Sequence, residues 1–123
     1  MSKELIDGFI LFKKYYDLLL WIYPVTRKFP NKEKYVLGEK IQTIALNVLE
    51  NIIMIASNKE REKALIKADI ELEKLRILIR LSNDLKLLDL RRYEYASKKI
   101  IEIGKILGGI IKSPIVKGQG IHQ

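Results

Sequence analysis

Hydrophobic side chains recur every three or four residues along most of this chain, the spacing at which side chains share one face of an α-helix. Three runs show this spacing clearly. They comprise Leu37, Ile41, Ile44, Val48, Ile52 and Ile55; then Leu65, Ala68, Leu72, Leu75 and Ile79; then Tyr93, Ala96, Ile100, Ile103, Leu107 and Ile110. Each run predicts an amphipathic helix that buries one face.

Breaks between these runs divide the chain into four predicted helices. Pro30 ends the first predicted helix, and Leu87-Leu88 fits a short turn before the fourth predicted helix. Asn31, Asn58 and Asp89 are suitable N-cap residues for the second, third and fourth helices. We therefore predict helices over about 8–28, 31–57, 58–85 and 89–112. Four amphipathic helices joined by short turns predict an all-α, up-down-up-down four-helix bundle over residues 1–112.

The first predicted helix is apolar on nearly its whole circumference. Its polar positions Lys13, Lys14 and Asp17 form one narrow strip, and eight of the ten aromatic residues of the chain lie before position 36. A helix of this kind must be covered on more than one side. We therefore expect a closed homo-oligomer. Pro24 should kink this helix or end it near Tyr23.

The ends of the chain carry little pattern. Residues 113–123 contain Pro114, Gly118 and Gly120 without periodicity and are predicted to form a flexible C-terminal tail. No secretory signal can be drawn at the N-terminus. The longest uncharged runs, 18–26 and 41–49, reach about half of the roughly 20 residues that span a membrane. We expect a cytoplasmic protein of one domain.

The composition excludes several kinds of chemistry. The chain has no cysteine, and its single histidine, His122, is the penultimate residue. Thiol catalysis, cysteine-based zinc sites and histidine catalysis are therefore not expected. Asp69 and Glu73 share a helix face, but Glu73 has Arg76 three residues away, so these carboxylates are interpreted as surface ion pairs. We predict no catalytic residue, no metal site and no cofactor.

Positive charge is concentrated in the C-terminal third. The chain carries 23 Lys and Arg against 15 Asp and Glu, a net charge of +8. Basic residues recur every seven positions along the fourth predicted helix, which places them in one stripe. Such a stripe suits a sequence-independent phosphate contact. The residues predicted to bind nucleic acid are Arg76, Arg80, Lys86, Arg91, Arg92, Lys98 and Lys105.

Two features of this region have alternative interpretations. The basic residues can equally form a solvated helix surface, because Lys98 can pair with Glu94 or Glu102. Gly104 and Gly108 lie four residues apart, a spacing that lets helix backbones approach closely. That approach can occur inside the bundle or between subunits.

Several short motifs, in this order and spacing, resemble the accessory variability determinant (Avd) proteins of diversity-generating retroelements. They are LLLWIYP at 18–24, KFP at 28–30, YVLG at 35–38, ELEKLR at 71–76, EIG at 102–104 and LGG at 107–109. The four-helix-bundle proteins of bacterial ribosomal-RNA intervening sequences share the KFP turn. Their usual second-helix runs are replaced here by QTIA at 42–45 and NIIM at 51–54, so the Avd resemblance fits better.

The Avd resemblance implies a homopentameric barrel of four-helix bundles with a basic surface. It further implies that the barrel binds RNA or DNA and a retroelement reverse transcriptase during mutagenic copying of a template RNA. The alternative is a structural oligomer of the intervening-sequence type with no polymerase partner. A membrane-surface module is disfavoured, because the basic residues lie on a folded bundle and not on an isolated amphipathic helix.

Overall fold

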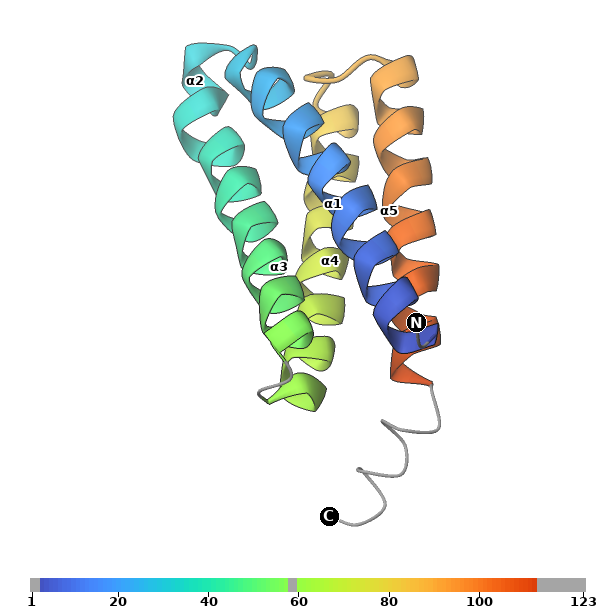
Figure 1. The fold of residues 1–123 in the computed structure, drawn as a ribbon. Coiled ribbons are helices and arrows are strands. Elements are labelled where there is room, and N and C mark those ends of the chain that lie inside the picture. The colour runs from blue at the N-terminus through green and yellow to red at the C-terminus, as the bar shows by residue number, and fades with distance from the viewer. Residues whose placement is uncertain (1–2, 58–59, 113–123) are drawn as a thin grey trace.

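The structure is a computed structural model that describes residues 3–57 and 60–112, and its long helices form an antiparallel four-helix bundle (Figure 1). These helices are α1 (Lys3–Arg27), α3 (Glu39–Ser57), α4 (Arg61–Asp84) and α5 (Leu90–Ile111). A short helix α2 (Asn31–Glu33) and a π-helical turn η1 (Lys34–Gly38) lead into α3. The all-α bundle is confirmed. The predicted tail, 113–123, lies outside the described residues.

The helices pack in a square in which α1 and α4 are diagonal partners. α1 contacts α3 and α5, and α4 contacts the same two helices. The predicted hydrophobic runs all lie in the shared core. On α1, the fully buried Tyr15 donates a hydrogen bond from its hydroxyl to the carbonyl of Ala45 in α3. Burial raises the pKa of Tyr15 above its ordinary value, so this phenol stays neutral in the core.

The helix starts match the sequence expectations only in part. Asp89 caps α5 as predicted, because its carboxylate accepts a hydrogen bond from the backbone N–H of Arg92 at 2.8 Å. The prediction for Asn31 was wrong: Pro30 occupies the cap position, and α2 begins at Asn31 without a side-chain cap. α4 begins at Arg61 after Glu60, and Asn58 lies outside the described residues.

Pro24 does not end the first helix. α1 continues through it to Arg27. Proline removes one backbone hydrogen-bond donor. Hydrogen bonds of the neighbouring Thr26 side chain hold the last turn of α1 in place. The hydroxyl of Thr26, which is buried, donates to the carbonyl of Ile22 at 2.9 Å and accepts from Gln42 Nε2 of α3 at 2.8 Å. The contact across to α3 thus supports the segment that follows the proline.

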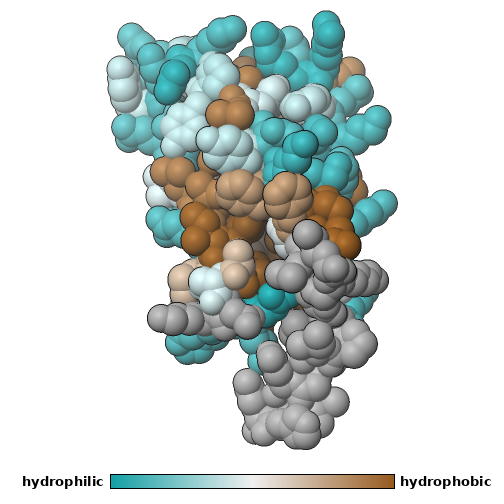
Figure 2. All heavy atoms as spheres, viewed as in Figure 1, coloured by the Kyte–Doolittle hydropathy of each residue, from teal (hydrophilic) through white to brown (hydrophobic). Residues whose placement is uncertain are grey.

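Two sets of large apolar side chains remain exposed on the subunit. The first, which we call the α1–α3 apolar face, comprises Phe9, Phe12, Tyr16, Leu20, Leu46 and Ile53. Figure 2 shows hydrophobic side chains gathered in a band across the middle of this side of the molecule, below a hydrophilic end. The second, the α4 apolar stripe, comprises Ile66, Ile70, Ile77 and Leu81. Because α1 and α4 are diagonal, the α1 side chains of the first set and the α4 apolar stripe lie on opposite sides of the bundle.

The exposed apolar residues do not indicate a membrane-spanning segment. Within residues 3–57 and 60–112, no helix combines the length and the hydropathy that crossing a bilayer requires.

Candidate nucleic-acid interface

The exposed surface of α5 carries a line of basic side chains. Arg91, Lys98 and Lys105 are exposed, and each lies seven residues from the next. Lys99 is half-buried beside them. At 1.5 Å per residue, the line from Arg91 to Lys105 extends over about 21 Å of helix. The predicted stripe therefore exists as one surface, which we call the α5 basic face.

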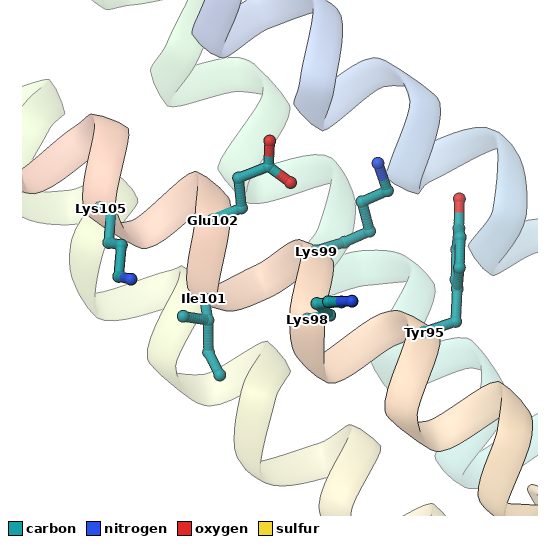
Figure 3. Close-up of a pocket in the computed structure, with 6 residues that line it drawn as sticks. All are labelled: Tyr95, Lys98, Lys99, Ile101, Glu102 and Lys105. Atoms are coloured by element: carbon teal, nitrogen blue, oxygen red, sulfur yellow. The ribbon is translucent and has the colours of Figure 1, made fainter.

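A shallow hollow of about 280 Å³ lies on this face (Figure 3). Its lining residues are Tyr95, Lys98, Lys99, Ile101, Glu102 and Lys105. Figure 3 shows Tyr95, Lys99 and Glu102 projecting toward α1, whereas Ile101 projects toward α4. Two residues predicted from sequence, Lys98 and Lys105, thus line the same hollow as an aromatic ring and a third lysine.

The ring of Tyr95 is fixed between α1 and α5. It lies 5.4 Å from the ring of Trp21 on α1, at an interplanar angle of 37°. The ammonium of Lys99 lies over the same ring, 5.9 Å from its centroid. A cation at this position is attracted by the electron-rich face of the ring. Tyr95 and Lys99 were not among the predicted site residues, because the contact with Trp21 depends on how two distant helices meet.

Glu102 is the acidic residue of the hollow, and α1 supplies its partner. Lys14 forms an ion pair with Glu102, whereas no ion pair joins Lys98 to a carboxylate among the residues that the structure describes. The hydrogen bond from Lys14 lowers the pKa of Glu102, so the carboxylate stays ionised and paired. Because Lys14 offsets this negative charge, Lys98, Lys99 and Lys105 leave the hollow with a positive excess.

Three of the predicted arginines have acidic neighbours one helical turn away. Arg76 donates from Nε to Glu73 at 3.0 Å, and this bond lowers the pKa of Glu73. Arg80 approaches Asp84 at 4.0 Å. Arg92 contacts the capping residue Asp89 at 2.7 Å, so it also stabilises the start of α5. Exposed ion pairs of this kind contribute little to the stability of the fold, so the arginines can exchange the carboxylate for another anion.

Lys86 occupies a backbone position that usually favours glycine. Its φ is 62°, in the left-handed region. The Lys86 N–H donates to Asn83 O at 3.0 Å and the Leu87 N–H donates to Ser82 O at 2.8 Å. These two bonds form a Schellman motif that ends α4 and turns the chain toward α5. A lysine at a glycine-type position suggests that its charge has a role beyond the turn.

We predict that Lys86→Gly separates these two roles. Glycine removes the Cβ strain of the left-handed residue, so the free energy of unfolding should rise by about 1 kcal/mol. The affinity for nucleic acid should fall, because the variant has one positive charge fewer. Urea denaturation and fluorescence anisotropy measure the two quantities. Unchanged affinity in the glycine variant would remove Lys86 from the interface.

The glycines of α5 do not bring it unusually close to another helix of the same subunit. A Cβ added at Gly104 would lie at an ordinary 3.8 Å from Leu72 Cδ2. A Cβ added at Gly108 or Gly109 would meet nothing within 4 Å. Close packing inside the bundle therefore does not explain these residues, and the subunit-contact interpretation stays a prediction.

No arrangement suited to metal binding is found in the part of the chain that the structure describes, since no three acidic or histidine side chains come together there. The chemistry that the α5 basic face offers is recognition of an anion: positive charge, an aromatic ring and one paired carboxylate.

Comparison with known proteins agrees with the four-helix fold. No curated protein sequence matches the chain. A crystal structure of a protein of unknown function from the S23 ribosomal protein family of Bacteroides thetaiotaomicron superposes with a TM-score of 0.80 at 19% identity, covering 87% of this chain and 99% of that one. This likeness shows the shared fold. The sequence model of the bAvd-like family matches residues 9–114, so the chain belongs to the bAvd-like family.

Proposed function

We propose that this protein is a non-catalytic accessory factor of a diversity-generating retroelement, which binds nucleic acid through the α5 basic face and acts with a reverse transcriptase. Membership of the bAvd-like family supports the accessory role. The α5 basic face is the observation that carries the nucleic-acid part of the proposal. Its lysines present charge to solvent, and Glu102 is neutralised from α1.

The form of this surface favours contacts with the phosphate backbone. Lysine and arginine on a regular helix can follow phosphates without reading base edges. The proposed contact also includes the predicted residues on α4 and in the α4–α5 turn, Arg76, Arg80 and Lys86. Arg76 and Arg80 can exchange Glu73 and Asp84 for phosphate, because these ion pairs are exposed.

Assembly into a closed ring, five subunits by the family resemblance, completes the proposal. The α1 side chains of the α1–α3 apolar face and the α4 apolar stripe lie on opposite sides of each subunit. A two-fold dimer would cover one of them and leave the other exposed. Head-to-tail contacts that close into a ring cover both. The ring also repeats the α5 basic face around the assembly, which multiplies its charge.

We predict that Gly108→Ala stabilises the subunit but weakens the ring. An alanine inside a helix gains up to about 1 kcal/mol over glycine, and the added Cβ meets no neighbour in the subunit. If Gly108 serves a close contact between subunits, the same methyl group must push that contact apart. Thermal unfolding and light scattering across a dilution series measure both effects. A more stable variant with unchanged association would exclude Gly108 from the subunit contact.

The direct test is binding of the full chain to a labelled duplex and to a labelled single strand over a salt series. Release of counterions from phosphate predicts a linear fall of log K with log salt concentration, by about 0.9 per neutralised phosphate on duplex DNA. Sequence should matter little. Co-purification with a retroelement reverse transcriptase, sought among the neighbouring genes, tests the partner.

The same measurements distinguish the structural alternative. An assembled ring that binds neither nucleic acid nor a polymerase would favour an oligomer of the intervening-sequence type.

A further inference from the structure

A second hollow, of about 190 Å³, lies at the end of the bundle where α1 stops and η1 begins. It is separate from the α5 basic face and contains none of the predicted binding residues. Its lining residues are Tyr23, Arg27, Lys34, Tyr35, Glu39 and Gln42. We call it the α1–η1 hollow.

The local backbone explains why these side chains surround a hollow. After α1, Phe29 turns into the core and α2 begins at once, which brings η1 back beside the last turn of α1. Within η1, Leu37 and Gly38 are buried, whereas Tyr35 is 61% exposed. π-helical turns are rare and occur frequently at functional sites. Here the turn holds a large aromatic ring out in solvent, although burying it would be favourable.

Each tyrosine of the hollow has a cation over its ring. The guanidinium of Arg27 lies 5.6 Å from the centroid of Tyr23, and the ammonium of Lys34 lies 5.7 Å from the centroid of Tyr35. Neither cation forms an ion pair with a carboxylate among the residues that the structure describes. The hollow contains one carboxylate, Glu39, against these two cations, so it keeps a positive excess.

The opposite wall is polar and fixed. The Gln42 amide donates to Thr26 Oγ1 at 2.8 Å, which holds its side chain against α1. Glu39 adds a carboxylate, an acceptor for the N–H groups on the edge of a base. The hollow thus combines aromatic faces, two cations and a hydrogen-bonding wall. A phosphate alone would use only the cations.

We propose that the α1–η1 hollow binds one unpaired nucleotide of a single-stranded nucleic acid, with the base stacked on Tyr35 and its phosphate between Lys34 and Arg27. Stacking on exposed aromatic rings beside basic residues is how proteins hold single strands, and a base inside a duplex is not available for it. The proposal rests on the proposed function and deepens it, because it selects single strands over duplexes.

The position of the hollow suits a strand that continues to the basic residues. Figure 1 shows the C-terminal end of α1, α2 and the α4–α5 turn at the same end of the bundle. That turn carries Lys86, and Arg91 lies in the first turn of α5. A strand held by its base in the hollow can therefore place its following phosphates near predicted phosphate contacts.

The first experiment tests the α1–η1 hollow independently of the α5 basic face, because it follows the tyrosines of the hollow. The full chain, carrying fluorine-labelled tyrosine, is titrated with adenosine 5′-monophosphate and, separately, with ribose 5-phosphate. We expect the mononucleotide to shift the Tyr35 and Tyr23 signals, and ribose 5-phosphate to shift them much less. Equal shifts with both probes would overturn the proposal in favour of a plain phosphate site. Equal shifts with a polyglutamate peptide would overturn it in favour of an acidic protein partner.

The second experiment compares variants on a twelve-nucleotide single strand and a twelve-base-pair duplex. Tyr35→Ala should weaken binding of the single strand by about tenfold, the effect of losing one stacked base, and leave duplex binding unchanged. Tyr35→Phe should retain the affinity, since the ring remains. Val36→Ala is the matched control, because Val36 is an exposed neighbour in η1 that does not line the hollow.

The outcomes separate the two proposals. Equal weakening on single strand and duplex, or unchanged binding in Tyr35→Ala, would overturn the single-strand site while the α5 basic face stands. If the wild-type chain bound the duplex but not the single strand, the single-strand site alone would be overturned. If it bound neither oligonucleotide, both proposals would be overturned.

Discussion

Replacing Phe9 and Leu20 together with glutamate is expected to convert the assembled protein into folded monomers. Both side chains are exposed on the subunit, by 69% and 58%, so the helix and the core should survive the change. In the proposed ring both are buried against the next subunit. Burying a large apolar side chain contributes about 1.5–3 kcal/mol, and losing two such contributions weakens association by a hundredfold or more. Light scattering at micromolar concentration measures the result.

A charge-matched variant controls for surface charge. Lys40→Gln with Thr43→Glu lowers the net charge by the same two units at exposed polar positions of α3. This control should keep its assembled size. A wild type that is already monomeric would contradict the ring, and so would an unchanged size in the double glutamate variant.

The same prediction extends to the head-to-tail arrangement. Ile77→Glu blocks the α4 apolar stripe and should also give monomers. An equimolar mixture of this variant with the Phe9 and Leu20 variant should form dimers, because each keeps one intact face and the two intact faces are complementary. If the α1–α3 apolar face paired with itself, the Ile77→Glu variant alone would dimerise.

The second large effect is expected from reversing two charges on the α5 basic face. Lys98→Glu with Lys105→Glu changes the face by four charge units in each subunit, and a ring repeats this change in every copy. Duplex binding should be abolished at moderate salt. Where binding remains measurable at low salt, the slope of log K against log salt should be smaller by roughly 0.9 for each phosphate that the variant no longer neutralises.

Lys40→Glu with Lys67→Glu is the matched control for this variant. Both lysines are exposed, on α3 and α4, and neither lines the hollow of the α5 basic face. The control has the same net charge as the test variant and should bind the duplex more tightly than the test variant does. Equal weakening in both would show that net charge alone determines binding, and full retention in the test variant would place the interface elsewhere.

The helices of this fold were predictable because each buries one regular stripe. The ends of the helices were less predictable, because a helix cap depends on the backbone conformation of one residue. Asp89 was identified correctly, since a short acidic side chain before a helix can reach its free N–H groups. At Asn31 the preceding proline took the cap position. The π turn at Lys34–Gly38 leaves no periodic signal, so the hollow beside it could not be anticipated.

Only the part of the α5 basic face that lies within one helix could be predicted from the sequence. The seven-residue spacing of Arg91, Lys98 and Lys105 places them together on any α-helix. The pairing of Lys14 with Glu102 and the contact of Trp21 with Tyr95 join residues more than seventy positions apart. Such contacts follow from helix packing, which cannot be inferred from the spacing of residues in a single sequence.

The contact between Trp21 and Tyr95 also gives the protein a built-in optical reporter. Trp21 is the single tryptophan of the chain, and it is half-buried against the ring that lines the hollow of the α5 basic face. A ligand that displaces Tyr95 or changes the local charge must alter the surroundings of this one indole. Its emission therefore follows occupancy of the hollow on the unlabelled chain, with no competing tryptophan signal from elsewhere in the subunit.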